Sequence, residues 1–263
     1  MLPDGLRLRL IDASVIKEPG DTGSQWRIHY SVDLSSLSCD EAHVTSIERG
    51  ESFANFRFRK GELGIADRAY GTPACLMSII GSGADALVRF TPRRLPLWTP
   101  DGSAKFQLLE KLRGLELGEA ASWAVSVKSS GKSFSGRVCA RRRQEKDAAK
   151  ERALVLKEAK RKRRDASALS LEMAGYVLLF TTMPEEKAAT AAVLKAYRLR
   201  WQVEMVFKRL KSILELGHLH KWNQDVVKAW LTGKLFAAAL IETLIRSGES
   251  FFPSRRRPQD LAE

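Results

Sequence analysis

Apolar residues in the first part of the chain follow the spacing of short strands separated by brief helices. Stretches typical of strands occupy residues 6–14, 26–34, 43–47, 63–67 and 86–90. Residues 51–58 favour a short helix, and Thr72 with Pro73 forms the cap and first-turn pair of a helix to about Ile80. The predicted order is three strands, a helix, a strand, a helix and a strand.

This order is that of a ribonuclease-H-like core, so we expect an α/β fold with a mixed sheet flanked by helices. The pattern changes after residue 90. Residues 121–127 and 134–140 favour two strands joined by a turn at 129–132. Residues 141–164 then carry 12 Lys and Arg against 4 acidic residues, which predicts a basic helix or mobile arm.

The predicted organisation is a core interrupted by an insertion. Residues 1–90 form the first part of the core, residues 91–168 a mainly β, basic insertion, and residues 169–250 the second part of the core. An apolar strand begins this second part at residues 175–183. A long helix from Glu185 to Leu216 follows, with Thr182 and Glu185 at capping-box spacing, and a second covers residues 225–245. Residues 251–263 are expected to be a flexible basic tail.

The long helix carries a polar stripe around one acid. The stripe lies within about 80° of the helix circumference at 100° per residue, and its members are Tyr197, Arg200, Glu204, Lys208 and Lys211. The opposite side consists of Leu199, Val203, Val206, Leu210 and Ile213. An ordinary amphipathic helix with a Glu204–Lys208 pair would show the same periodicity, and periodicity alone favours this simpler interpretation.

Two further acids change this balance. Asp12 and Asp67 each stand at the end of an apolar strand, where a carboxylate is costly unless it is paired, hydrogen-bonded or bound to a metal. Either one alone could cap a following element. Together with Glu204 they supply hard oxygen ligands of the kind that Mg²⁺ prefers when phosphates complete its coordination. Two such ions can stabilise the attacking and leaving oxygens of a displacement at phosphorus.

The overall charge fits a polyanionic partner. The formal net charge is +13, which raises the expectation of nucleic-acid binding, although a solvated basic surface is an equally simple interpretation. The most apolar segment, residues 231–245, is too short to span a bilayer, so no membrane partner is expected. Three widely spaced cysteines predict neither a disulfide framework nor a zinc site, which favours a reducing cytoplasm. The histidines have no metal-ligand spacing, and we expect His29, His43, His218 and His220 to be structural or surface residues.

Three motifs together resemble a known family. The pattern Tyr197-x2-Arg200-x3-Glu204-x6-Lys211 is similar to the signature of DDE transposases of the insertion-sequence-four type, which belong to the ribonuclease-H-like integrases. The strand ending in Asp12-Ala-Ser resembles the first-acid motif of the family, and Asp67-Arg-Ala-Tyr resembles the second, Asp-Arg-Gly-Tyr. The resemblance extends from about Arg7 to Trp230, and the family places a mainly β insertion before the glutamate helix.

The resemblance implies roles for these residues. Asp12, Asp67 and Glu204 would be the catalytic residues and hold two Mg²⁺ ions, for which Mn²⁺ can substitute. The enzyme would cut DNA at transposon ends and transfer the freed strand into target DNA, with a homodimer assembled on DNA near the nucleoid. Phosphates near the cleaved end would be bound by Tyr197, Arg200 and Lys211, with Lys208 on the same stripe. Trp201 is a candidate for stacking on a displaced base, with core packing as the alternative.

Two departures from the family pattern keep alternatives open. Ala69 replaces the usual glycine, which is a mild change unless the turn requires positive φ. Only eleven residues precede Asp12, so we expect the usual N-terminal DNA-binding domain to be lacking and recognition of DNA ends to be impaired. The alternatives are a truncated, non-catalytic DNA-binding remnant, or another ribonuclease-H-like nuclease with the same metal chemistry.

Overall fold

The computed structural model describes residues 2–18, 25–217, 219 and 223–251. Its contacts divide the chain into two compact units. The first unit comprises Met1–Ile11 and Glu51–Gln202, and the second comprises Asp12–Gly50 and Val203–Glu263. The boundary passes through the first strand, which contributes residues to both units.

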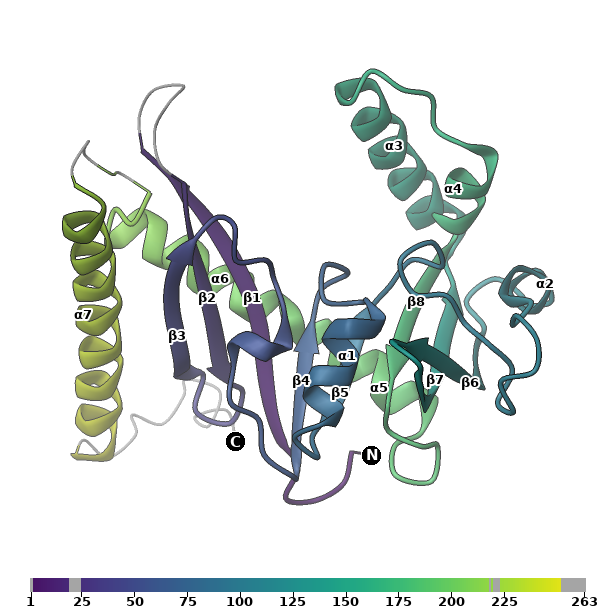
Figure 1. Ribbon diagram of the computed structural model, residues 1–263, viewed down its shortest axis with the longest axis horizontal. Coiled ribbons are helices and arrows are strands. Elements are labelled where there is room, and N and C mark those ends of the chain that lie inside the picture. The colour runs from purple at the N-terminus through teal and green to yellow at the C-terminus, as the bar shows by residue number, and fades with distance from the viewer. Residues whose placement is uncertain (1, 19–24, 218, 220–222, 252–263) are drawn as a thin grey trace, which may run out of the picture. The chain divides into compact units, whose positions relative to one another are not determined.

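The described residues form eight strands (Figure 1). The strands are β1 (Arg7–Lys17), β2 (Gln25–Asp33), β3 (Ser38–Ser46), β4 (Glu62–Ala66), β5 (Asp85–Arg89), β6 (Ala120–Ser129), β7 (Lys132–Arg142) and β8 (Tyr176–Thr181). The helices are η1 (Phe53–Asn55), α1 (Pro73–Ile80), α2 (Leu108–Arg113), α3 (Glu145–Arg161), α4 (Ala168–Met173), α5 (Thr190–Tyr197), η2 (Arg198–Arg200), α6 (Trp201–Ile213) and α7 (Gln224–Phe251).

Strand pairing in the first unit follows the order β1-β4-β5-β8-β7-β6. β1 pairs with β4, and β4 with β5, in parallel, whereas β5–β8, β8–β7 and β7–β6 are antiparallel. In the second unit the order is β3-β2-β1. The result is a mixed sheet flanked by helices, in the element order predicted for a ribonuclease-H-like core. The predicted fold class is confirmed.

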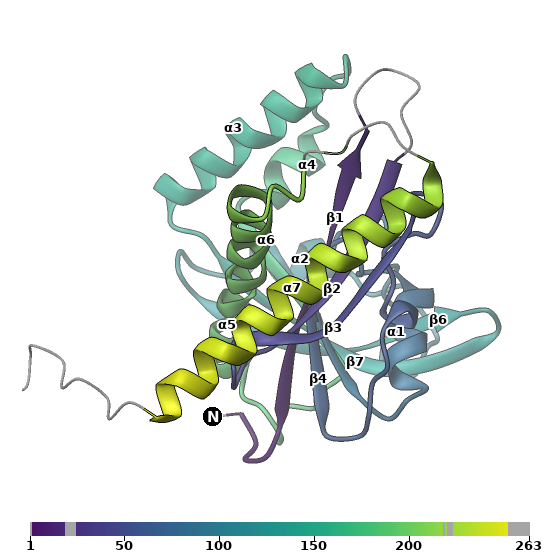
Figure 2. The same cartoon turned by 90° about the vertical axis from the view of Figure 1, so that its left-hand side faces the viewer.

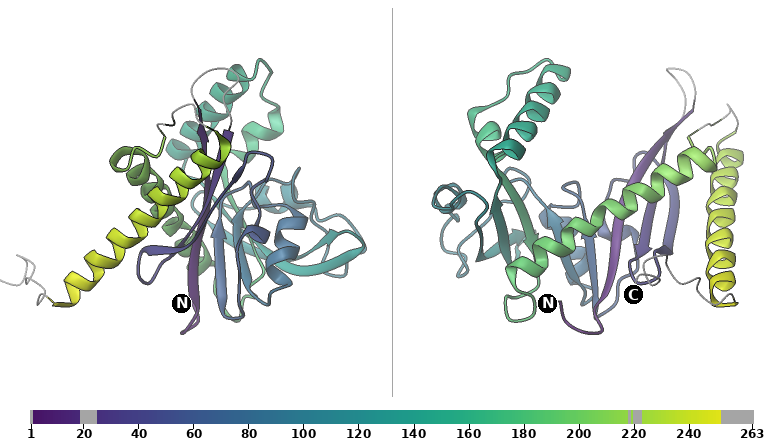
Figure 3. Two further views of the ribbon diagram at one scale, coloured as in Figure 1. Left: turned by 60° about the vertical axis from the view of Figure 1, so that its left-hand side comes forward. Right: turned by 180° about the vertical axis from the view of Figure 1, so that it is seen from behind.

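The core of the first unit forms on both faces of its strands. Phe53 of η1 and Leu76 and Ile79 of α1 are fully buried in one apolar cluster with alternate residues of the strands. α5 covers the opposite face, as seen from behind in Figure 3, and its Val193 and Ala196 are buried. Strands buried on both faces explain the nearly continuous apolar runs of β4 and β8.

Close packing explains a glycine inside β4. A Cβ atom on Gly64 would lie 2.8 Å from the side chain of Ile79 and 3.1 Å from the rings of Phe53 and Phe58. A side chain at this position would therefore push α1 and η1 away from the strand that leads to Asp67.

The hairpin of β6 and β7 confirms the two strands predicted after residue 120 and extends both of them. Its two-residue turn places Ser130 at φ 47° and Gly131 at φ 77°, the left-handed conformations that match the twist of a tight hairpin. β7 also pairs with β8, so the hairpin lengthens the sheet. The limits of the insertion at residues 91 and 168 stay a prediction.

The predicted single helix from Glu185 to Leu216 is wrong in its bounds and its continuity. It begins at Thr190 with α5, passes through the 3-10 turn η2 and ends with α6 at Ile213. The carboxylate of Glu185 instead accepts a hydrogen bond from the backbone N–H of Thr190 at 3.0 Å and pairs with the buried guanidinium of Arg137. Thr182, the expected cap, donates its hydroxyl to Asp85 at 2.6 Å. Long-range partners thus replace the local capping box, and residues 182–189 form an irregular connection with a turn at residues 185–187.

The second unit places α6 and α7 against its strands (Figure 2). The ring of Phe207 on α6 lies 5.7 Å from the ring of Tyr30 on β2. α7 is anchored to β3 because Glu242 accepts the backbone N–H of Cys39 at 2.8 Å. The predicted second long helix is confirmed, and it runs to Phe251. The predicted tail beyond Phe251, together with His218 and His220, lies outside the described residues.

His29 is fully buried on β2 and contacts the Thr45 hydroxyl at 3.0 Å, in agreement with the structural role predicted for it. Among the described helices, none has the length and apolar character that a membrane span requires.

Candidate active site

Asp12 is positioned by the strand that carries it. The preceding residues Leu10 and Ile11 are fully buried, and Leu10 pairs with Ile65 of β4. The Asp12 side chain is partly exposed, and its Oδ1 accepts the backbone N–H of Ala13 at 2.8 Å. The strand therefore brings a carboxylate out of an apolar core to the surface of the second unit.

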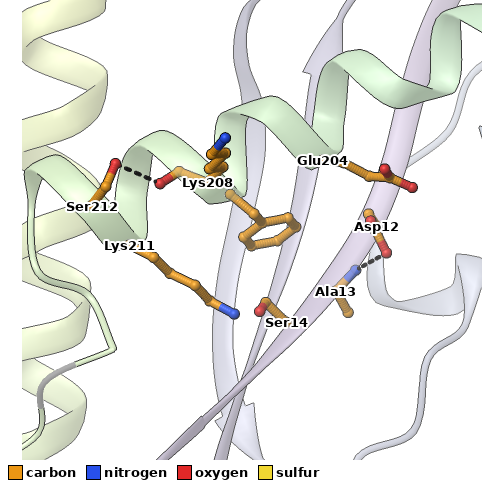
Figure 4. Close-up of a pocket in the computed structure, with 8 residues that line it drawn as sticks. Asp12, Ala13, Ser14, Glu204, Lys208, Lys211 and Ser212 are labelled. Carbon is orange, nitrogen blue, oxygen red and sulfur yellow. Dashed lines mark hydrogen bonds between the residues drawn. The ribbon is translucent and has the colours of Figure 1, made fainter.

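Asp12 and Glu204 line one pocket within the second unit (Figure 4). The full lining is Asp12, Ala13 and Ser14 from β1, and Glu204, Phe207, Lys208, Lys211 and Ser212 from α6. Figure 4 shows the carboxylates of Asp12 and Glu204 directed toward each other, while the ammonium group of Lys211 extends toward Ser14. Two acids and two lysines from distant parts of the sequence thus share one surface.

The apolar face of α6 determines which side chains reach this pocket. Val203, Phe207 and Leu210 are buried, so Glu204, Lys208 and Lys211 remain exposed on the other side. The predicted apolar positions Val203 and Leu210 are confirmed. The predicted burial of Ile213 is wrong, since this side chain is 73% exposed at the helix end.

Phe207 was missed by the sequence reasoning, although it both packs in the core and lines the pocket. Its signal was available, because it follows Val203 by four residues and precedes Leu210 by three. Ser212, whose hydroxyl donates to the Lys208 carbonyl at 2.8 Å, gave no comparable signal.

Asp67 belongs to the first unit, directly after the fully buried strand β4. Its Oδ1 accepts the backbone N–H of Ala69 at 2.7 Å, and Arg94 donates to the carbonyls of Arg68 at 3.3 Å and Ala69 at 3.1 Å. These bonds fix the turn after the strand. Ala69 is not among the described residues with positive φ, so alanine in place of the family glycine costs no backbone strain here.

Tyr197 and Arg200 form a second part of the candidate site in the first unit. The Arg200 guanidinium lies 5.9 Å from the centre of the Tyr197 ring. Burial raises the pKa of Tyr197, the charges of Arg200 and Arg89 lower it, and the carboxylate of Asp67 raises it. Tyr197 therefore lies within electrostatic reach of Asp67 and two cations. Arg89, at the end of β5, gave no sequence signal because it is a single arginine outside any motif.

Trp201 begins α6 and is 51% exposed. This exposure shows that Trp201 is not a core residue, and about half of the residue's surface is accessible to a planar partner.

The acids of the second unit fit a magnesium ion in number and type. In proteins Mg²⁺ is commonly held by one or two carboxylates together with substrate phosphates, and Asp12 and Glu204 supply two carboxylates to one pocket. Across the described ranges, no group of three or more His, Cys, Asp or Glu side chains is placed to hold a metal ion. The structure thus brings together two of the three predicted ligands, whereas Asp67 is part of the first unit.

The sequence matches the family described as "Transposase DDE domain" over residues 4–240. The chain belongs to the DDE transposases. The resemblance inferred from the three motifs is therefore confirmed, and with it the function in DNA transposition. These enzymes cleave DNA and transfer its strands.

Several relatives of this DDE transposase come from insertion sequences. It is 36% identical over 255 residues to the "Putative transposase InsL for insertion sequence element IS186A" of Escherichia coli (strain K12), covering 95% of this chain and 69% of the relative. It is also 36% identical over 255 residues to the "Transposase for insertion sequence element IS421" of Escherichia coli, covering 95% and 68%.

Among solved structures, it is similar to a piggyBac transposase in a synaptic complex with hairpin DNA, with a TM-score of 0.46 and 8% identity. This match covers 91% of the present chain and 48% of that chain.

Proposed function

We propose that this transposase cuts DNA at the ends of its element and joins the freed strand to target DNA at a site built from Asp12, Asp67 and Glu204. The single observation that carries this proposal is the shared pocket of Asp12 and Glu204. Asp12 is partly exposed and Glu204 is exposed, while their neighbours Ile11 and Val203 are buried, which supports access by a phosphate group.

Strand register supports Asp67 as the third acid. Leu10 pairs with Ile65 in the parallel ladder of β1 and β4, and Asp12 and Asp67 each stand two residues beyond these partners. In a parallel pair, residues at equal offsets from a matched pair leave the ladder at the same end. We therefore infer that Asp67 acts together with Asp12.

Two Mg²⁺ ions, replaceable by Mn²⁺, would supply activation of the attacking oxygen and stabilisation of the leaving oxygen when held by these carboxylates. The protein's own contribution is binding and orientation. Asp12 on a buried strand and Glu204 on an anchored helix are held by packing before DNA arrives, which lowers the entropic cost of aligning the reacting groups.

The cations and aromatic residues around these acids would bind the DNA. Lys208 and Lys211 line the pocket beside Glu204 and would neutralise phosphate charge there. Arg200, placed near the Tyr197 ring, would bind a phosphate next to the cleaved bond, with the Tyr197 hydroxyl as a hydrogen-bond donor. The exposed ring of Trp201 would stack on a displaced base.

The partners that follow are transposon ends and target DNA. Joining two ends to one target favours a homodimer assembled on DNA. The site of action would be the cytoplasm, at the nucleoid, where the free cysteines stay reduced.

The test is cleavage of a duplex that carries the ends of the element, with Mg²⁺ or Mn²⁺, by the natural chain and by Glu204→Gln. We expect cleavage and strand transfer by the natural chain. Glu204→Gln should lose cleavage by more than about 100-fold, since even outer-shell partners of metal ligands typically contribute 10–100-fold. DNA affinity should change by less than about threefold, because this glutamate binds metal and not phosphate.

Three outcomes would contradict the proposal. Full cleavage by Glu204→Gln would exclude its role as a metal ligand. DNA binding without any cleavage by the natural chain would indicate a non-catalytic remnant. Cleavage without strand transfer would indicate another ribonuclease-H-like nuclease.

A further inference from the structure

The helix α3 presents a row of lysines that the proposed active site does not use. Its length is 17 residues, and it packs beside α4 in the first unit (Figure 1). Ala148 and Ala159 are buried on one side of the helix. The exposed side carries the lysine row, which we define as Lys146, Lys150, Lys157 and Lys160.

Helical geometry aligns the lysine row. At 100° per residue, its four members lie within about 80° of one another, and Ala148 and Ala159 lie on the opposite side of the helix. Ala153, also exposed, falls in the middle of the row. At 1.5 Å per residue, the row extends about 21 Å along the helix axis. This length corresponds to about six base pairs of duplex at 3.4 Å each.

The acids of α3 are occupied by other cations. Glu145 pairs with Arg152 at 2.6 Å, and Glu158 pairs with Arg161 and Lys162, both at 2.8 Å. Only Lys150 of the row has a recorded ion pair, a long one of 3.8 Å to Asp147.

A third acid, Glu151, pairs with Arg143 at 3.1 Å and Arg89 at 3.6 Å. Within the described ranges, no ion pair involves Lys146, Lys157 or Lys160. The charge of the row therefore remains available for a polyanion.

We infer that the lysine row binds the phosphate backbone of duplex DNA without reading its bases. This inference takes DNA as the ligand from the proposed function. It adds a DNA-contact surface that does not include the three proposed catalytic acids or the Tyr197–Arg200 pair. Lysine ammonium groups on flexible stems act as point charges and bind phosphates without the bidentate geometry that identifies a base. Contacts of this kind supply affinity and orientation, whereas specificity comes from elsewhere.

A membrane surface fits this helix less well. Leu154 and Leu156 are exposed at 60% and 52%, but they lie on opposite flanks of the lysine row, about 160° apart. An interfacial helix needs a continuous exposed apolar face opposite its cations. Here that side carries Ala148, Val155 and Ala159, of which the alanines are buried and the valine is half-buried.

The test compares two variants of the full chain with equal loss of charge. The first carries Lys146→Gln, Lys150→Gln, Lys157→Gln and Lys160→Gln. The control carries Lys60→Gln, Lys111→Gln, Lys132→Gln and Lys187→Gln, all exposed lysines of the same unit. Affinity for two duplexes of unrelated sequence is measured between 50 and 200 mM salt, alongside circular dichroism.

We expect the slope of log K against log salt to fall by up to about 3.6 in the row variant, since each phosphate contact contributes about 0.9. The control should change the slope by less than about 1 on the same scale, and both duplexes should behave alike. Equal slopes in the two variants, or a loss on one duplex only, would overturn the inference.

A second measurement leaves the charge of the row intact. Ala153→Cys introduces an accessible thiol among cysteines that are buried or half-buried, and Ala104→Cys is an exposed control elsewhere in the unit. Cross-linking to a duplex carrying a thiol-reactive group on its backbone should succeed at position 153 and not at 104. Equal cross-linking at both positions, or none at 153, would refute a contact.

Failure of this inference is distinguishable from failure of the proposed function. A row variant that binds and cleaves DNA like the natural chain would refute only the lysine row. A natural chain that neither binds nor cleaves DNA would refute the proposed function as well.

Discussion

The carboxylates of Asp12 on β1 and Glu204 on α6 face each other across one pocket, although the two residues lie near opposite ends of the family match (Figure 4). Their juxtaposition depends on burial around each of them. Leu10 and Ile11 hold the strand, and Val203 holds the helix, all without solvent exposure. The folded core thus places two like charges together, an arrangement that a bound cation would stabilise.

The first prediction concerns Asp12. Asp12→Asn removes a charged metal ligand while keeping size and shape, so DNA cleavage in Mg²⁺ should fall by more than about 100-fold. Ser212→Ala, in the same pocket, should retain cleavage within about threefold, because the only partners of this hydroxyl among the described residues are carbonyls of its own helix. Both are measured by strand cleavage at saturating DNA. Comparable losses in the two variants would argue against a specific ligand role for Asp12.

The second prediction concerns Arg200. Arg200→Ala should weaken DNA binding and lower the salt-dependence slope by about 1, as expected for loss of one phosphate contact. Arg198→Ala is the matched control, since Arg198 belongs to the same short helix η2 but is more exposed. Salt titration of duplex binding measures both. An unchanged slope in Arg200→Ala would remove this residue from the DNA surface.

The third prediction tests how α6 is held. Phe207 is 6% exposed and contacts Tyr30, so Phe207→Ala should lower the free energy of unfolding by about 3–5 kcal/mol. Ile213→Ala, at a side chain that is 73% exposed, should change it by less than about 0.5 kcal/mol. Denaturant unfolding provides the values. Similar effects of the two changes would mean that α6 is not anchored through Phe207.

The fourth prediction concerns the glycine of β4. Gly64→Ala should destabilise the first unit by about 1–3 kcal/mol, because the added methyl group meets Ile79, Phe53 and Phe58. Gly50→Ala is the control, since nothing lies within 4 Å of a Cβ atom there. Thermal and denaturant unfolding should agree. A neutral Gly64→Ala variant would show that α1 and η1 can move away without cost.

The fifth prediction is a pH dependence of stability from His29. Burial, followed by the charges of Arg27 and Arg49, lowers the pKa of His29 from 6.5 to about 4. Above pH 6.5 the imidazole is neutral in both folded and unfolded chains, and its contribution to stability is complete. As the pH decreases from 6.5 to 4, the unfolded chain takes up a proton that the folded chain does not. The free energy of unfolding therefore decreases as the pH is lowered through this range.

Denaturant unfolding between pH 7 and pH 4.5 measures this effect. His29→Asn should lose most of the dependence, whereas His43→Asn, on an exposed side chain, should keep it. Identical pH profiles for the natural chain and His29→Asn would contradict the assignment.

Local patterns were sufficient to predict the strands, the hairpin and the exposed side chains of Glu204, Lys208 and Lys211 on α6, whereas the rest of the predicted stripe lies on α5 and η2. Ser130 and Gly131 illustrate why, since a tight turn depends on residues adjacent in sequence. The start of α5 could not be predicted in this way. Glu185 has the spacing of a local cap, but its carboxylate is taken by Arg137 and Ser122, both far away in sequence. These partners approach Glu185 only after β7 has paired with β8, and a local sequence pattern does not predict that pairing.

The candidate site divides in the same manner. Asp67 could be named from a strand end and Glu204 from a motif, because both signals are local. The strand end predicted at Asp12 is wrong, since β1 continues to Lys17 and Asp12 lies within it. The electrostatic coupling of Tyr197 to Arg89 could not be predicted, since it depends on where β5 ends relative to α5.

Phe207 is the one side chain of α6 that is both buried in the core and part of the pocket lining. Every other residue that lines the pocket from this helix is exposed, where substitutions usually change stability by less than about 0.5 kcal/mol. Glutamine can therefore replace Glu204 and both lysines in one polypeptide with the fold intact. In this triple variant, Glu204, Lys208 and Lys211 could be restored one at a time. The change in DNA affinity on restoring each residue would then measure its separate contribution to DNA binding.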